Sequence, residues 1–254
     1  MNTVQTPYGE IDVSKLRVGD VANLALQRTD TLFDTGIPKI RSPSYLFWAR
    51  FKIALPLKVE ASLRWRGIVS EAMATISTEV EQIVACLGPS PVRKLCDIGC
   101  GYAFHDVLFC RLMELSHVHL IDIEQTSERH HDFNRKGAGY SDLSVAKALI
   151  ECNTTAEAMP EITTLNPQRE ALDFGRSFDL ILSLLSCGFH YPVDTYTPFF
   201  DRCLAEGGRI VLDLRKGEDH STLFEGFQVE RTIVEQDKSA RVTLVRKSDR
   251  ARCS

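Results

Sequence analysis

Short apolar runs alternate with amphipathic stretches from about residue 92 to the end of the chain. The runs have the length of buried strands, and the stretches between them repeat apolar residues every three or four positions, as one face of a helix does. Two final runs joined by a polar turn predict a closing hairpin. The seven expected strands cover 92–98, 118–122, 161–165, 178–184, 209–214, 227–234 and 241–246. Because strands and helices alternate, the sequence predicts an α/β fold with a doubly wound, mostly parallel seven-stranded sheet and a terminal antiparallel strand.

The first 90 residues depart from this alternation. Residues 1–44 are polar and broken by glycines and prolines, so no regular element is expected there. Helices are expected over 45–55, which is rich in aromatic residues, and over 69–87, where apolar residues recur at helical spacing. The sequence therefore predicts an N-terminal extension and helical cap over 1–90, followed by the α/β domain over 91–254.

Composition indicates a soluble globular protein, with 44% hydrophobic and 25% charged residues. The net charge of −4 argues against a protein that mainly coats nucleic acid. No apolar run approaches the ~18 residues of a membrane span, so we expect a cytoplasmic protein with no membrane association. The 8 cysteines form no C-x-x-C pair and are expected to be reduced core residues. No cluster has metal-ligand spacing, and no metal is expected.

A glycine-rich turn follows the first expected strand of the α/β domain. Gly99 and Gly101 let the backbone turn tightly and approach a ligand, and the N–H groups of the following helix would face that ligand. The dinucleotide fingerprint G-x-G-x-x-G requires a glycine where Phe104 stands, so a nicotinamide-dependent dehydrogenase is disfavoured. Asp97, just before the turn, suits a cationic group on the ligand.

At these residues the chain resembles the class I S-adenosylmethionine (SAM)-dependent methyltransferases. Their first motif is an acidic residue, one spacer and Gly-x-Gly-x-Gly, which the turn matches, with Ala103 in place of the third glycine. Asp122, at the end of the next strand, matches the acid that holds the ribose hydroxyls in the family. Further matches at 178–183 and 204–212 extend the resemblance over about residues 92–247.

The resemblance implies SAM as the cofactor, bound at the carboxyl ends of the strands. Asp97 would hold the amino-acid end, and Asn166 would contact the adenine amino group. Ile123 would contact the adenine face. The expected cofactor-binding residues are Asp97, Gly99, Cys100, Gly101, Tyr102, Asp122, Ile123, Asn166 and Ser183. An alternative for the two acids is that they only cap helices.

The loop after the fourth expected strand carries the candidate catalytic residues. His190 has an ordinary pKa near ~6.5, suited to taking a proton at neutral pH. Tyr191 and Asp194 could orient the imidazole or the substrate. The loop lacks the Asn/Asp-Pro-Pro-aromatic motif of the amino-methylating branch of the family, which favours a hydroxyl acceptor. The alternative is that His190 is a structural loop histidine.

The segment 38–66 combines 7 basic residues with one acid and 5 interleaved aromatic residues. It could offer cations to an anionic acceptor, or its aromatic residues could anchor helices while the charges stay in water. The sequence thus favours methyl transfer to a small polar acceptor, anionic or sugar-like, at oxygen. RNA methylation or another N-methylation, and a catalytically silent SAM-binding subunit, stay open as alternatives.

Overall fold

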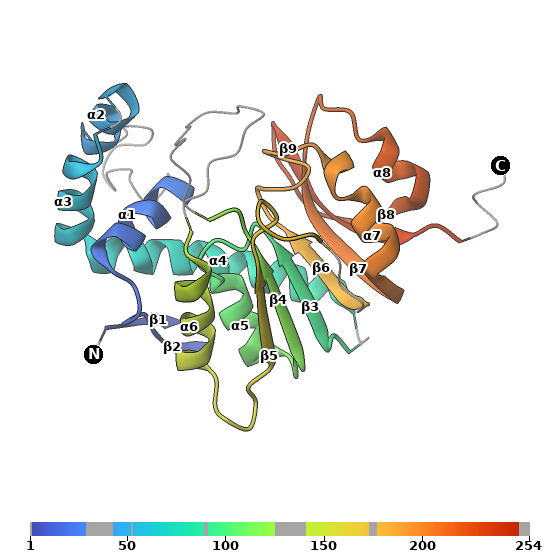
Figure 1. The fold of residues 1–254 in the computed structure, drawn as a ribbon, viewed down its shortest axis with the longest axis horizontal. Helices are drawn as coiled ribbons and strands as arrows, with labels where there is room; N and C mark the ends of the chain where they lie inside the picture. The colour runs from blue at the N-terminus through green and yellow to red at the C-terminus, as the bar shows by residue number, and fades with distance from the viewer. Residues whose placement is uncertain are drawn as a thin grey trace.

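The computed structural model describes residues 2–28, 43–51, 53–88, 91–124, 141–172 and 177–248. A seven-stranded sheet lies at its centre, with the strand order β5-β4-β3-β6-β7-β9-β8 (Figure 1). Its strands are β3 (Lys94–Ile98), β4 (His117–Ile121), β5 (Glu161–Leu165), β6 (Phe178–Ser183), β7 (Leu204–Arg215), β8 (Phe227–Glu235) and β9 (Ser239–Arg246). Neighbours from β5 to β7 are parallel, and β9 runs antiparallel between β7 and β8. The predicted sheet is therefore confirmed.

The direction in which strands are added reverses beside β3. From β3 the chain proceeds outward to β4 and β5, and then returns to place β6 on the other side of β3. In sheets of this kind a crevice opens at the carboxyl ends of the strands where the order reverses. The topology therefore marks the ends of β3 and β6 as the position of a binding site.

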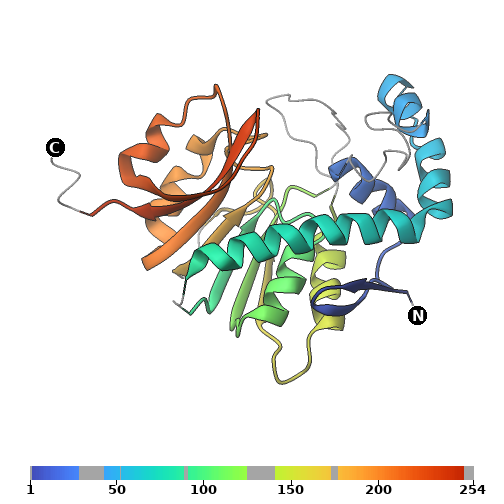
Figure 2. The ribbon, with the colours of Figure 1, turned by 180° about the vertical axis from the view of Figure 1, so that it is seen from behind.

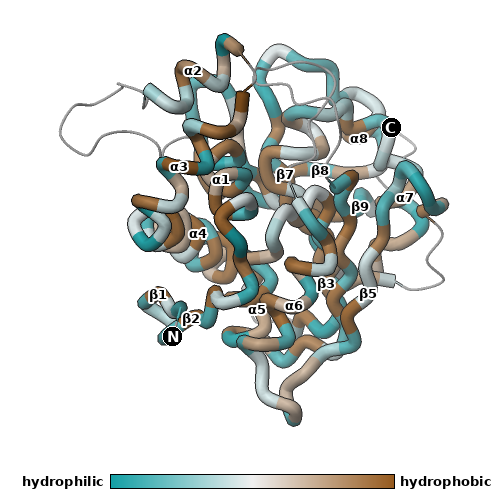
Figure 3. The backbone as a smooth tube through the Cα atoms, turned by 60° about the vertical axis from the view of Figure 1, so that its left-hand side comes forward, coloured by the Kyte–Doolittle hydropathy of each residue, from teal (hydrophilic) through white to brown (hydrophobic). Residues whose placement is uncertain are grey.

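Helices cover both faces of the sheet. They are α4 (Trp65–Leu87), α5 (Phe104–Leu112) and α6 (Leu143–Asn153) on one face, and α7 (Thr197–Cys203) and α8 (Ser221–Gly226) on the other. Helix α4 crosses its face of the sheet in Figure 2, and Figure 3 shows both polar and apolar residues along the helices. Neighbouring residues of a strand point to opposite faces, so Leu95 packs in the first layer and Cys96 in the second. Within the described ranges, no helix is long and apolar enough to span a bilayer.

Residues 2–28 form regular elements, so the expectation of an irregular segment over 1–44 is wrong for this part. The elements are β1 (Thr3–Thr6), β2 (Gly9–Asp12) and α1 (Val18–Gln27), and the two strands pair as an antiparallel hairpin. Each strand has only 4 residues, too few for an alternating pattern to stand out. Residues 29–42 lie outside the described part of the chain.

Two polar residues on the buried side of α1 weaken its helical pattern in the sequence. Asp20 and Asn23 are both buried. The Asp20 carboxylate accepts hydrogen bonds from the backbone N–H of Arg17 at 2.8 Å and from the Tyr102 hydroxyl at 3.1 Å. The side-chain amide of Asn23 donates to the same hydroxyl at 3.2 Å. These hydrogen bonds offset the cost of burying polar groups inside the fold.

The expected aromatic helix over 45–55 is two helices in the structure. They are α2 (Pro43–Phe51) and α3 (Leu55–Leu63), and Pro56 lies in the first turn of α3, where its missing N–H costs no hydrogen bond. Trp48 is fully buried whereas Leu63 is 82% exposed, so these helices pack by one side only. Both lie near α1 at one end of the molecule (Figure 1).

A buried network of charged side chains joins the two ends of the chain. At its centre is Glu79 of α4, whose carboxylate lies 2.7 Å from the guanidinium of Arg28 and 3.0 Å from that of Arg241 in β9. Arg241 also donates to the carboxylate of Asp213 in β7 at 2.8 and 2.9 Å. The imidazole of His105 in α5 lies 2.9 Å from Glu79. These five side chains are at most 13% exposed, so their charges are compensated by one another rather than by water.

Buried residues before and after the expected boundary belong to one hydrophobic cluster. Leu24 of α1 and Ile76 of α4 share it with Leu95 of β3. The helical cap therefore packs directly on one face of the sheet. The division of the chain into 1–90 and 91–254 stays a prediction.

Replacing Glu79 with alanine should destabilise the protein strongly. The substitution removes the carboxylate that the guanidinium groups of Arg28 and Arg241 share in the interior. Removing one partner of a buried ion pair costs about 3–5 kcal/mol of unfolding free energy. Urea denaturation of E79A and of a control, E230A, measures the effect. Glu230 pairs with Arg209 nearer the surface, where loss of the pair should cost less than about 1 kcal/mol. Equal losses in the two variants would contradict the role given to the network.

Candidate functional site

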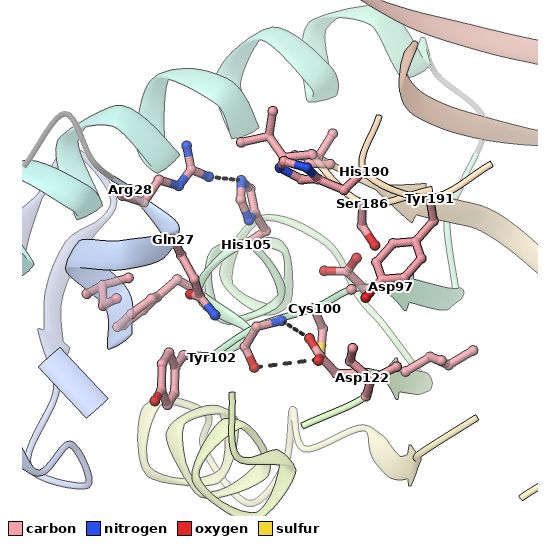
Figure 4. A pocket seen from close by; sticks show the side chains of 18 of the residues that line it. Gln27, Arg28, Asp97, Cys100, Tyr102, His105, Asp122, Ser186, His190 and Tyr191 are labelled. Carbon is pink, nitrogen blue, oxygen red and sulfur yellow. Dashed lines mark hydrogen bonds between the residues drawn. The ribbon is translucent and has the colours of Figure 1, made fainter. Parts of the chain in front are cut away.

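A cavity of about 230 Å³ lies at the carboxyl ends of β3, β4 and β6. Its walls come from the glycine-rich turn after β3, the end of β4, the loop after β6, and the C-terminal half of α1 (Figure 4). The cavity therefore occupies the crevice that the reversal of strand order creates. Residues far apart in the sequence meet there, from Leu24 to Tyr196.

The turn after β3 has the backbone geometry that its glycines suggest. Gly99 and Gly101 have φ values of 78° and 59°, and the N–H of Gly99 donates to the carbonyl oxygen of Ile121 at 2.7 Å. Ala103 also has a positive φ, 56°. This position is the one where the methyltransferase motif usually carries glycine. Alanine is strained in this conformation but has no side chain beyond Cβ, so the turn keeps its shape.

Two carboxyl groups face the cavity from neighbouring strands. Asp97 is the fourth residue of β3 and is only 3% exposed, and burial together with the nearby Asp106 raises its pKa. Asp122 follows β4. Its carboxylate accepts the backbone N–H of Gly101 at 2.9 Å and that of Glu124 at 3.1 Å. Burial raises the pKa of Asp122, and these hydrogen bonds oppose the shift. The turn therefore lies between two acids with fixed positions.

The loop after β6 forms the wall opposite α1. It is anchored by the N–H of Leu185, which donates to the Asp213 carboxylate at 3.1 Å, and by the N–H of His190, which donates to the Ser186 carbonyl at 2.8 Å. Burial and the charge of Arg215 lower the pKa of His190, so its imidazole is neutral at neutral pH.

Tyr191, next to His190 in the loop, brings a phenol group to the same wall. Its hydroxyl oxygen is buried and has no hydrogen-bond partner within the described ranges. Burial and the charge of Asp122 raise the pKa of Tyr191 to about 12. The phenol therefore keeps its proton at neutral pH and can donate a hydrogen bond into the cavity.

Most of the residues predicted from the sequence line this one cavity. They are Asp97, Gly99, Cys100, Gly101, Tyr102, Asp122, Ile123, His190 and Tyr191. They were predicted from their positions at or after the ends of the expected strands, because parallel strands bring their carboxyl ends to one edge of the sheet.

Three predicted residues are not part of the cavity lining. Ser183 is fully buried and its hydroxyl donates to the carbonyl oxygen of Ile98 at 2.7 Å. The Asn166 side-chain amide donates to the carbonyl oxygen of Ile123 at 3.2 Å, so it supports the wall from behind. Asp194 is exposed and accepts a hydrogen bond from Thr222.

The sequence did not predict that α1 forms a wall of the cavity. The side chains of Gln27 and Arg28 face the cavity, and His105 joins them there (Figure 4). The carboxamide of Gln27 lies over Gly101, at 3.2 Å from where a Cβ would stand. The recurrence of apolar residues from Val18 to Leu26 is the sequence signal that could have revealed this helix.

The basic segment 38–66 contributes no residue to the cavity lining in its described part, residues 43–51 and 53–66. Lys39 and Arg41 lie outside the described residues, and the side chain of Lys52 is not described. The others, Arg50, Lys58, Arg64 and Arg66, stand elsewhere on the cap. In the described part of the chain, Arg28 is the only lysine or arginine that lines the cavity.

The sequence matches no protein-family model and no curated protein. Among solved structures, it is similar to magnesium protoporphyrin IX methyltransferase from Synechocystis PCC 6803 with bound SAM, with 14% identity over 91% of this chain and 98% of that chain and a TM-score of 0.44. It is also similar to precorrin-6y C5,15-methyltransferase from Geobacter metallireducens, with 18% identity over 70% and 88% and a TM-score of 0.43. An rRNA methylase from Streptococcus thermophilus shows 13% identity over 68% and 95%, with a TM-score of 0.43. These TM-scores are below 0.5, and the fold of this chain is defined by its own strand order.

Replacing Gly99 with alanine should destabilise the turn more than the same change at a comparable glycine. The added Cβ would overlap the Ser186 side chain, and the positive φ adds strain of about 1–2 kcal/mol. Gly207 has a φ of 72° with open space around it, so G207A should show the strain alone. Chemical denaturation measures both variants. Adding S186G to G99A should recover the part due to overlap, and a double variant no more stable than G99A would contradict this explanation.

Proposed function

We propose that the protein transfers a methyl group from SAM to a small polar acceptor. The observation that carries the proposal is the pair Asp97 and Asp122, which face one cavity from the ends of neighbouring strands with the glycine turn between them. SAM supplies a methyl group on a positively charged sulfur, so the donor is already activated. The protein then needs to align the two reactants and exclude water, and orientation alone can contribute about 7–11 kcal/mol.

The cavity lining fits the chemical groups of SAM. Asp97 offers a carboxyl group to the ammonium of the amino-acid end. Asp122 accepts the backbone N–H of Gly101 on one carboxylate oxygen and that of Glu124 on the other, and its fixed carboxylate can accept from the ribose hydroxyls. Ile123 and Pro167 provide apolar surface at the same end of the cavity for the adenine ring. Gly101 has no side chain, which leaves room beneath Gln27.

The rest of the lining carries no carboxylate in the described part of the chain. It includes His190 and Tyr191 on one side, and Arg28 and His105 on the other. His190 and Tyr191 are neutral, and the positive charge of Arg28 is paired with Glu79, so these groups do not favour a cationic acceptor. We therefore place the acceptor between the β6 loop and α1. A sugar-like or carboxylate-bearing molecule has the matching hydrogen-bond chemistry.

His190 has the properties of a general base for a hydroxyl acceptor. Its imidazole is held neutral by burial, and a neutral imidazole can take the proton as the acceptor oxygen attacks the methyl carbon. The C–S bond electrons go to sulfur, which becomes a neutral thioether. The Tyr191 hydroxyl has no hydrogen-bond partner within the described ranges, so it can donate to the acceptor and position it. We leave Asp194 out of the catalytic set because it faces Thr222 instead.

Calorimetric titration with SAM and S-adenosylhomocysteine tests the cofactor site. Both ligands should bind, and D97N and D122N should weaken binding by roughly 10- to 100-fold, because each removes a charge-assisted interaction worth about 1.5–3 kcal/mol. The control D179N changes an aspartate near the start of β6, at the amino-terminal ends of the strands and away from the cavity. There its carboxylate accepts hydrogen bonds from the backbone N–H groups of Arg93 and Lys94. It should bind like the wild type. No detectable affinity of the wild type for either ligand would end the proposal.

Replacement of His190 tests the catalytic assignment. A panel of small hydroxylated compounds, screened by release of S-adenosylhomocysteine, identifies an acceptor. H190A should then lower kcat by roughly 10²–10⁴-fold and leave SAM affinity unchanged. Because the pKa of His190 is lowered, wild-type activity should persist as pH falls to about 6.5 and decline only below it. The control H117A alters a histidine paired with Glu161 away from the cavity and should keep full activity. Undiminished kcat in H190A would refute a base role.

A further inference from the structure

Large apolar side chains gather on the outer surface of helices α2 and α3. Of the eleven large hydrophobic residues that are exposed in the described part of the chain, seven lie between positions 46 and 63. Their exposed fractions run from 40% at Phe47 to 82% at Leu63. Single exposed apolar residues are normal in globular proteins, whereas a concentration of them marks an interaction site.

The exposed residues of α3 follow the period of a helix. Leu55, Val59 and Leu63 are spaced by four positions and are 67%, 51% and 82% exposed. The opposite side of the helix carries Leu57 and Ala61, which are buried in the hydrophobic cluster on that face of the sheet. Residues four apart lie on one face of a helix. Helix α3 therefore has an inner apolar face in the core and an outer apolar face at the surface.

Helix α2 repeats this arrangement. Tyr45 and Trp48 are buried in the same cluster, whereas Phe47 and Phe51, again four positions apart, are 40% and 57% exposed. The two phenyl rings contact each other, with their centroids 4.8 Å apart. Helices α2 and α3 contact each other and lie at one end of the molecule (Figure 1). We call their joint outer surface the α2–α3 face; it consists of Leu46, Phe47, Phe51, Leu55, Val59 and Leu63.

The charges that the two helices add to this face are positive. Arg50 in α2 and Lys58 in α3 are exposed, and each comes three positions after an exposed apolar residue of its own helix. Glu60 is the one acid of the segment 38–66, and its carboxylate is bound to Arg64 at 2.5 Å and to the Ser44 hydroxyl. The chain as a whole has a net charge of −4, so this end of the molecule is basic within an acidic protein.

We propose that the α2–α3 face is a docking surface for a membrane that contains anionic lipids. Its apolar side chains enter the boundary between headgroups and acyl chains, while Arg50 and Lys58 extend their charged ends to the lipid phosphates. An apolar helix face with cations beside it is typical of binding at the membrane surface. The expectation of no membrane association rests on the lack of a spanning segment, and a surface contact needs none. The inference is independent of the proposed function.

A bilayer fits this face better than a second copy of the chain or an RNA. In a two-fold contact both copies present the same face, so the cations of one would meet those of the other. Glu60 is already held by Arg64 within its own copy. Leucine and valine side chains have no ring on which a nucleic-acid base can stack. An anionic bilayer supplies both the hydrocarbon and the negative charge that the face calls for.

Co-sedimentation with lipid vesicles tests the proposal. The wild type should bind vesicles with about one third phosphatidylserine at least tenfold more strongly than vesicles of phosphatidylcholine alone, because anionic headgroups attract the cations. V59S/L63S should weaken binding to the anionic vesicles by about tenfold or more, since two apolar side chains no longer enter the bilayer. R50Q/K58Q should weaken it by a similar factor at low salt, and by less at high salt, where the charges are screened.

Matched controls carry the same kinds of change on other surfaces. L112S/V229S replaces two exposed apolar residues, in α5 and β8. R93Q/K216Q neutralises one arginine and one lysine whose side chains are 55% and 43% exposed. Both controls should bind the anionic vesicles like the wild type. Circular dichroism checks that every variant is folded, and if the α3 variant is not, F47S/F51S makes the same test on α2.

Three results would overturn the inference. The first is a wild type that binds neither kind of vesicle, and the second is equal binding by the apolar variant of the face and its control. The third is a dimer that forms without lipid and that V59S/L63S separates, as measured by light scattering, because the face would then belong to a second copy. Binding of a single-stranded RNA in place of vesicles counts with the first result.

Discussion

The reversal of strand order beside β3 is the constraint on which the site depends. Because β4 and β6 lie on opposite sides of β3, their connections leave in different directions and a crevice opens between them. The glycine turn and the loop after β6 fill the rim of that crevice. Gly99 lets these two segments touch, since any side chain at that position would meet Ser186. The shape of the cavity is thus set by backbone topology before any side-chain chemistry is considered.

Buried charged side chains also hold the walls of the cavity in place. Glu79 holds Arg28 and His105 at the cavity wall, and Arg241 connects it to Asp213. Asp213 in turn accepts the N–H that anchors the β6 loop. The walls on either side of the proposed acceptor position are therefore tied to the same network.

The sequence predicted the sheet, and it predicted that Asp97 and Asp122 lie at one edge of it, because both features leave strong local signals. Buried parallel strands are continuous apolar runs, and the turn after β3 has two glycines that its backbone requires. Strand-end position was less reliable for Asn166 and Ser183. Their side chains hydrogen-bond the backbone around them, and such partners are not visible in sequence.

The cavity wall formed by α1 was not predicted from the sequence, for a different reason. Asp20 and Asn23 interrupt its apolar face, and their burial makes sense only once Tyr102 is placed beside them, some 80 positions later in the chain. The Glu79 network has the same character, because its hydrogen-bonded partners are separated by up to 162 positions. Long-range polar pairing is specified by the fold as a whole and leaves no periodic trace.

The position of Arg241 has a consequence for how the protein is made on the ribosome. Strand β9 inserts between β7 and β8, so β8 is synthesised before the neighbour that joins it to the sheet. Until Arg241 emerges, Glu79 and Asp213 lack the cation that lies between them in the finished molecule. A nascent chain that has already formed α1 and α4 therefore completes this buried network of charges only after β9 has been translated.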